Sequence, residues 1–194
     1  MIVDHPGSHF IFVYHPYVFY GRSYITYQGR PLTNKEYLDH WGKWIVLGSR
    51  KRLDDLAAKL DLYVEQGVIP CVKYDREPPK EMDLEVKQKL RRRFIDVGQD
   101  EAVLMECVMC VFCDQRQREE VWQILTGLGV NLKAWVYEKE TIDLWLPGGI
   151  LLERWIAQNC SGEDEAEKVR QESQERFRET FKNEDAIYKG WPQQ

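Results

Sequence analysis

The chain has 194 residues and a formal net charge of −5, and 43% of its residues are hydrophobic and 30% charged. This composition indicates one globular domain rather than a disordered chain, and no window is apolar for long enough to span a membrane. The acidic balance argues against wide-surface binding of duplex DNA, because such binding depends on Lys and Arg side chains that neutralise phosphates.

The first residues show no cationic segment followed by an apolar one, which is the pattern of a secretory signal. We therefore expect a cytoplasmic protein. Its cysteines number five, an odd count, and in that compartment we expect reduced thiols rather than a disulfide framework.

In the first part of the chain, aromatic and β-branched runs predict strands, and apolar residues at three- and four-residue steps predict helices. Thr33 followed by Glu36 is a capping box that should open a short helix through Asp39. Ser49 caps the clearest helix of the chain, which Gly67 ends. The predicted strands around these helices span residues 10–14, 23–27, 43–47 and 68–74.

In the second part, the apolar run over residues 102–113 predicts a central strand that is buried on both faces. Residues 132–137 and 142–146 resemble a final pair of strands, and residues 163–184 a charged surface helix or partly ordered tail. We therefore divide the chain into an α+β domain over residues 1–162 and a charged C-terminal segment over 163–194. Further helices are expected over residues 82–94, 118–126 and 151–156.

Three cysteines at short spacing, Cys107, Cys110 and Cys113, are the residue type that binds zinc or an iron–sulfur cluster. In a strand, however, Cys110 would point away from the other two, which would be about 20 Å apart along an extended chain. Small buried residues of a central strand are therefore the preferred interpretation, and no metal site is predicted. No cofactor is expected either, since no glycine-rich phosphate loop precedes a helix.

Two lysines lie within predicted strands, where each shares a face with apolar residues. Lys43 lies on the face of Ile45 and Leu47, and Lys73 on that of Ile69 and Cys71. Either the ammonium groups reach water at the strand ends, or they form an anion site, because an unpaired buried charge is costly.

A later segment combines cations with aromatic rings. Lys133, Trp135, Tyr137 and Lys139 should alternate onto one face of a strand, where they would suit a phosphorylated or nucleotide-like ligand.

Several short motifs stand out: Gly42-Lys43-Trp44-Ile45, Val72-Lys73-Tyr74, the run from Val108 to Asp114, Glu119-Glu120-Val121, Leu128-Gly129-Val130, and Tyr137-Glu138-Lys139 with Ile142. Together they resemble the basophilic-leukaemia-expressed (Bles) protein family, whose bacterial relatives are labelled phosphothreonine lyase domain proteins. The similarity covers residues 42–146, slightly over half of the chain. It departs from the family pattern at Tyr74-Asp75, over residues 78–98, and at Glu138 and Glu140.

The resemblance implies a curved, mostly antiparallel sheet with helices on one face, similar to the cap-binding translation initiation factor fold. It also implies a β-elimination in which a lysine removes the Cα proton of a phosphothreonine and a second cation neutralises the departing phosphate. The matching lysines are Lys43, Lys73 and Lys139. Weaker candidates for phosphate binding and general acid catalysis are Arg22, His40 and Arg50.

Three functions follow from these patterns. The first is an enzyme that acts on a phosphorylated peptide or a small phosphate ester. The second is a noncatalytic module for a nucleotide or a single-stranded RNA end, in which two of Trp41, Trp44, Trp135 and Trp145 would face each other across a cleft. The third is an adaptor whose C-terminal helix binds a partner.

Overall fold

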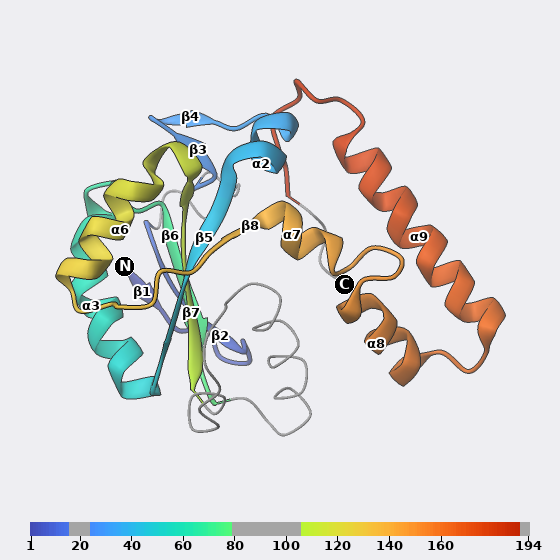
Figure 1. The fold of residues 1–194 in the computed structure, drawn as a ribbon, viewed down its shortest axis with the longest axis horizontal. Coiled ribbons are helices and arrows are strands. Elements are labelled where there is room, and N and C mark those ends of the chain that lie inside the picture. The colour runs from blue at the N-terminus through green and yellow to red at the C-terminus, as the bar shows by residue number, and fades with distance from the viewer. Residues whose placement is uncertain (16–23, 79–105, 191–194) are drawn as a thin grey trace.

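The computed structural model describes residues 1–15, 24–78 and 106–190. Within them, the main element is a six-stranded sheet in which all neighbouring strands are antiparallel (Figure 1). Its order is β1 (Ile2–Val3), β2 (Phe10–Tyr14), β6 (Cys71–Asp75), β7 (Cys107–Asp114), β5 (Trp41–Gly48) and β8 (Trp135–Tyr137). A separate hairpin pairs β3 (Thr26–Tyr27) with β4 (Arg30–Pro31). This sheet and its helices confirm the α+β class.

The two longest strands, β5 and β7, pair along their whole length in the middle of the sheet. Their register runs from Trp41 opposite Asp114 to Gly48 opposite Cys107. Side chains alternate between the two faces of a strand, and β7 accordingly alternates between buried and half-buried residues. The central position of β7 is confirmed, whereas the prediction that it is buried on both faces is wrong.

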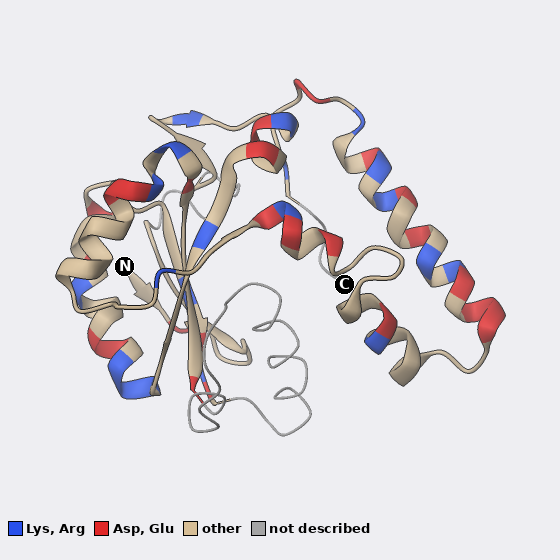
Figure 2. Ribbon diagram, in the orientation of Figure 1, with Lys and Arg blue, Asp and Glu red and all other residues tan. Residues whose placement is uncertain are grey.

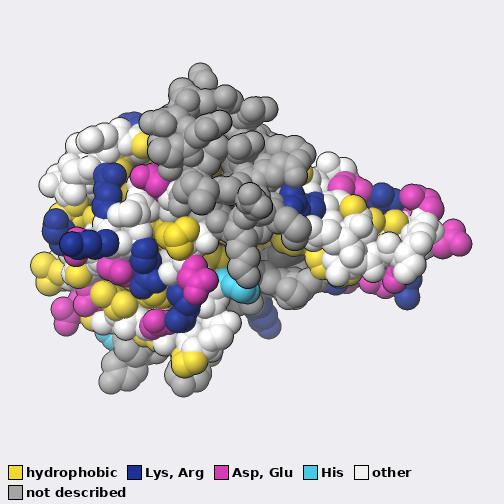
Figure 3. Space-filling model, turned by 90° about the horizontal axis from the view of Figure 1, so that it is seen from below, with side chains coloured by type: hydrophobic (Ala, Val, Ile, Leu, Met, Phe, Trp, Pro, Cys, Tyr) yellow, Lys and Arg dark blue, Asp and Glu magenta, His cyan; other side chains and the backbone are white. Residues whose placement is uncertain are grey.

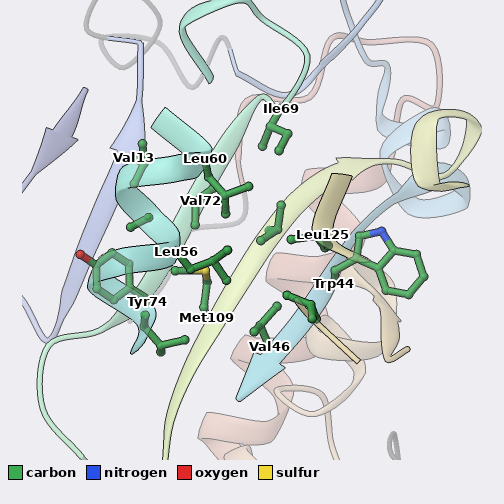
Figure 4. Close-up of a cluster of buried hydrophobic side chains, with 14 of the residues drawn as sticks. Val13, Trp44, Val46, Leu56, Leu60, Ile69, Val72, Tyr74, Met109 and Leu125 are labelled. Atoms are coloured by element: carbon green, nitrogen blue, oxygen red, sulfur yellow. The ribbon is translucent and has the colours of Figure 1, made fainter. Parts of the chain in front are cut away.

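One face of the sheet is covered by α3 (Arg50–Glu65) and α6 (Arg118–Gly127). Ser49 begins α3 as predicted, since its hydroxyl accepts the N–H of Arg52. Leu56 and Leu60 of α3 are buried in a cluster with strand residues such as Met109 (Figure 4). Burial contributes about 1.5–3 kcal/mol for each leucine, so this cluster is the main core.

Four further helices lie toward the β5–β8 end of the sheet, among the residues described. They are α2 (Asn34–His40), α7 (Glu138–Asp143), α8 (Ile150–Asn159) and α9 (Glu163–Phe181). Figure 1 shows α7 on the opposite side of the sheet from α3 and α6. The expected placement of helices on one face therefore holds for α3 and α6 and not for α7.

The predicted strand over residues 132–137 is confirmed as the shorter β8, whereas the predicted strand over residues 142–146 is wrong, because the chain enters α7 directly after β8. The backbone N–H of Tyr137 donates to the side chain of Glu140 at 3.0 Å, which caps the helix. Glu138 and Glu140 in the first turn also suit the positive end of the helix dipole. Ile142 is then buried on one side of α7 instead of continuing a strand.

The charged C-terminal segment is helical, as predicted, and it packs against the rest of the chain. Ala166 of α9 is buried against α8, and the hydroxyl of Ser173 donates to the carbonyl of Trp145 at 2.5 Å. Phe181 joins a second core with Tyr37 of α2. Figure 2 shows Lys, Arg, Asp and Glu along the length of α9. It is therefore a docked helix and not a loose tail.

Two predictions fall wholly or partly outside the described residues. The helix over residues 82–94 lies outside the described residues. The strand over residues 23–27 is reduced to the two residues of β3, which continue into a turn where Gln28 has a φ of 51°.

A network of charges centred on Glu36 fastens the start of α2. Thr33 and Glu36 form the predicted capping box, with hydrogen bonds of 3.2 and 3.1 Å between the backbone N–H of each and the side chain of the other. Glu36 also accepts a hydrogen bond of 2.9 Å from Arg30 of β4 and lies 3.7 Å from Arg116. The hydrogen bond with Arg30 is the main cause that lowers the pKa of Glu36 to about 2.

Glu36→Gln should lower the free energy of unfolding at neutral pH by roughly 1–2 kcal/mol, because the ion pairs are partly exposed. The pKa of Glu36 is about 2 in the folded chain against an ordinary 4.5, so its contribution is complete above pH 4.5 and is lost as the pH falls toward 2. The free energy of unfolding, measured by urea denaturation, should be lower in Glu36→Gln than in wild type by a constant amount above about pH 5. Below that pH the two values should approach each other. The exposed pair of Glu179 and Lys182 provides the control Glu179→Gln. The prediction would be contradicted if the free energies of unfolding of wild type and Glu36→Gln differed as much at acid pH as at neutral pH.

Candidate functional site

The face of the sheet that points away from α3 and α6 carries two of the predicted lysines, and we call it the open face only to distinguish it from the face that these two helices cover. Lys73 of β6 pairs in register with Phe12 of β2 and Cys110 of β7, and Lys43 of β5 pairs with Phe112 of β7. All five residues are only partly buried. The open face consists of Phe10, Phe12, Lys43, Ile45, Leu47, Lys73, Asp75, Val108, Cys110 and Phe112.

The ammonium of Lys43 is held by α7. Its Nζ donates to Glu138 Oε1 at 2.5 Å and to Thr141 Oγ1 at 2.9 Å, and the two side chains of the ion pair are only 12% and 15% exposed. Burial by itself lowers the pKa of Lys43, but the negative charge of Glu138 and its hydrogen bond outweigh burial and raise the pKa above the ordinary value. Lys43 is therefore a fixed cation at neutral pH and not a proton acceptor.

Lys73 has a different environment on the same face. Its Nζ lies 4.3 Å from the centroid of the Phe10 ring. No carboxylate of the described residues forms an ion pair with it. A cation–π contact uses one side of an ammonium group and leaves other N–H donors available. Lys73 can therefore offer hydrogen bonds to an anion above the open face.

Cys110 lies between the two lysines. It is opposite Lys73 and two residues from Phe112, the partner of Lys43. Burial raises the pKa of the Cys110 thiol, and the positive charges of Lys43 and Lys73 partly oppose this effect. The two ammonium groups thus act on one patch centred on Cys110, although strand spacing separates the lysine Cα atoms by roughly 12 Å.

The cysteines of β7 follow the predicted alternation. Cys107 and Cys113 are buried on the helix-covered side, whereas Cys110 is partly exposed on the open face. In the parts of the chain that the structure covers, no three His, Cys, Asp or Glu side chains come together as metal ligands.

Lys139 does not lie on the sheet. It is the second residue of α7 and is exposed, so the expected alternation from Lys133 to Lys139 along one strand is wrong beyond Tyr137. Lys133 precedes β8 and forms a surface ion pair with Glu119 at 3.1 Å. Of the three lysines that the family resemblance implies, the structure brings together Lys43 and Lys73.

The predicted aromatic ligands lie on the opposite face from these lysines. Trp44 is buried, donates from Nε1 to the carbonyl of Arg118 at 3.1 Å, and contacts Trp135 edge-on at a centroid distance of 5.3 Å. Trp135 in turn lies 5.8 Å from Tyr137 and so close to Gly42 that a Cβ there would be 2.4 Å from its ring. These rings pack against one another, so the predicted pair across a cleft is wrong for Trp44 and Trp135.

The weaker candidates for phosphate binding do not join the open face. Arg50, at the start of α3, donates to Asp54 at 3.0 Å and lies 5.5 Å from the ring of Tyr74 on the helix-covered side. His40 ends α2, and its Nδ1 atom is buried with no hydrogen-bond partner among the described residues. Arg22 lies outside the residues that the structure describes.

Sequence reasoning missed the residues that hold Lys43. Glu138 and Thr141 follow it by 95 and 98 positions, and Glu138 was noticed only as a departure from the family pattern. The sequence contains one indication of such a partner. Burying an unpaired lysine charge on an apolar strand face costs free energy, so a buried lysine predicts an acidic partner somewhere in the chain. Phe10 and Phe12 were assigned to a strand, but without pairing no pattern placed them beside Lys73.

The described surface shows no extended basic region on the face in Figure 3, where Lys and Arg alternate with Asp and Glu. Among the helices of the described residues, none has the length and apolar character needed to cross a membrane.

Fold and site together define an α+β protein with a cationic, partly apolar sheet face. No family model, no curated protein and no solved structure matches the chain. The similarity to the Bles family and to the initiation-factor fold therefore stays a prediction.

Glu138→Gln should destabilise the folded chain by about 2–3 kcal/mol, because it leaves the ammonium of Lys43 without its counter-charge in a poorly solvated position. The matched control is Glu119→Gln in the exposed pair with Lys133, where the side chains are 53% and 58% exposed. There the loss should be less than about 0.5 kcal/mol. Equal losses in both variants, measured by urea denaturation, would show that the pair with Lys43 has no special role in stability.

Proposed function

We propose that the chain acts on a phosphate ester of the phosphothreonine type, in a phosphorylated peptide or a small molecule, on the open face between Lys43 and Lys73. The observation that supports this most is the unequal pairing of the two lysines. Lys43 is neutralised by Glu138, whereas Lys73 has no acidic partner in the described part of the chain. A phosphate would supply the missing negative charge.

The roles of the lysines follow from these contacts. Lys73 binds the phosphate as an ammonium group and passes one proton to a phosphate oxygen, and its amine is then the candidate base that takes the Cα proton. The electron pair of that C–H bond forms the Cα–Cβ double bond, and the Cβ–O bond breaks with its electrons going to the phosphate oxygen. Lys43, held by Glu138 and Thr141, contributes a fixed positive charge near the departing phosphate.

Mass spectrometry of a phosphothreonine peptide incubated with the purified protein tests this function. Loss of phosphoric acid to give a dehydrated residue is the expected product, whereas loss of phosphate with the hydroxyl retained would indicate hydrolysis. Lys73→Met should reduce turnover by about 100-fold or more, the usual contribution of a general base.

Lys73→Arg separates binding from catalysis. Arginine keeps the positive charge but does not act as a base, so the peptide should bind with an affinity close to that of wild type and turn over as slowly as with Lys73→Met. Lys59 is an exposed residue of α3, which covers the other face of the sheet. As a control, Lys59→Met should leave turnover unchanged. Turnover that survives Lys73→Met would remove Lys73 from the mechanism.

A second candidate function, noncatalytic binding of a nucleotide or of a single-stranded RNA end, is favoured by the aromatic residues of the open face. The rings of Phe10 and Phe12 lie edge to face at 6.5 Å along β2 and are partly exposed beside Lys73. Nucleobases stack on such rings, while a nearby lysine contacts phosphate.

Calorimetric titration with mono- and dinucleotides tests this second function. Phe12→Leu should weaken binding by about 1–2 kcal/mol, the usual contribution of one base–ring stack. Phe177→Leu removes a ring of α9 in the second core and serves as the control. A flat titration with the wild-type protein would exclude the nucleotide function.

A further inference from the structure

The last described residues, 182–190, run along the start of α2, and we call them the C-terminal strap. Backbone N–H groups of Lys35 and Asn34 donate to the carbonyls of Glu184 and Ala186 at 3.0 and 2.8 Å. The N–H of Tyr188 donates in turn to the carbonyl of Leu32 at 3.0 Å. The bonds donated by Lys35 and Asn34 use N–H groups that the first turn of a helix leaves without intrahelical partners. The strap is therefore an integral part of the fold around α2.

Tyr188 connects the strap to the second core. Its ring stacks on that of Tyr37 with a centroid distance of 3.6 Å and an interplanar angle of 14°, and it lies 5.8 Å from the ring of Phe181. The Tyr188 side chain is 7% exposed. Ile187, its neighbour, is 57% exposed, so Tyr188 is the residue by which the strap enters the core.

From Tyr37 the contacts continue to the open face. Tyr37 lies on α2, which packs against α7. Tyr37 is buried in the same cluster as Ile142 of α7. Glu138, one helical turn before Ile142, bonds the ammonium of Lys43. Contacts thus run from Tyr188 through Tyr37 and α7 to Lys43 on the open face.

We propose that Tyr188 is a positioning residue of the site, which fixes Tyr37 against α7 and thereby holds the carboxylate of Glu138 on the ammonium of Lys43. The consequence for catalysis rests on the proposed function. The effect on Lys43 itself does not, because it can be measured without any substrate. The backbone bonds of the strap fasten α2 without the ring of Tyr188, so the ring has a separable role.

The test is reductive methylation of the full-length protein with formaldehyde, followed by peptide mass spectrometry, at several pH values. In wild type, Lys43 should react slowly and with a high apparent pKa. In Tyr188→Leu its rate at about pH 9 should rise by about threefold, which corresponds to half a unit in pKa. Lys35 and Lys59, both exposed, are internal references, and Ile187→Ala is the control for a change in the strap alone.

A rise confined to Lys43 supports the proposal. An unchanged rate at Lys43, or an equal rise at all three lysines, overturns it. If circular dichroism shows that Tyr188→Leu does not fold, Tyr188→Met decides, since its flexible side chain fills the space of the ring without stacking on Tyr37. In that variant a faster Lys43 supports the proposal and an unchanged rate overturns it.

Turnover of the phosphothreonine peptide is recorded in parallel and distinguishes the two failures. If wild type leaves the peptide intact while Tyr188→Leu still changes Lys43, the proposed function fails and the positioning role stands. If wild type converts the peptide while Tyr188→Leu leaves the methylation rate of Lys43 unchanged, the function stands and the positioning role fails.

Discussion

The antiparallel pairing of β5 with β7 is the constraint on which the rest of the molecule depends. Its eight partner pairs decide which side chains of the two central strands face the helices and which face the other side. A shift of one residue would exchange the two sets, and would move Lys43 into the core and Trp44 out of it. The core beneath α3 and α6 and the cationic open face are therefore two results of one register.

The ion pair between Lys43 and Glu138 is the second interaction that orders the structure. It joins a central strand to the first turn of α7 across 95 residues of sequence. Because each side chain is nearly shielded from water, neither charge is well solvated without the other. The pair therefore fixes α7 over the open face. Because α2 packs against α7 in the second core, the pair also helps to position α2.

The sequence predicts local elements well and their spatial relations poorly. Ser49 and the Thr33–Glu36 capping box place two helix starts, because capping depends on residues within one turn. Alternation along β7 likewise separates Cys110 from Cys107 and Cys113. The change from strand to helix at Glu138 was not predicted, because Ile142 fits either a strand or the buried side of a helix. The pairing of Lys43 with Glu138 was out of reach, since no local pattern relates positions so far apart.

The contacts of α2 with the C-terminal strap have a consequence for the order in which the chain folds. The side chain of Asn34 donates to the carbonyls of Thr180 and Asn183, which follow it by 146 and 149 residues. Contacts of such separation close late, because the entropy of a long loop is lost before they form. During synthesis, the sheet and its covering helices have all their residues well before the second core does. Tyr37 thus remains without its stacking partner until residue 188 has been added, and the second core is exposed to misassembly in a nascent chain for that time.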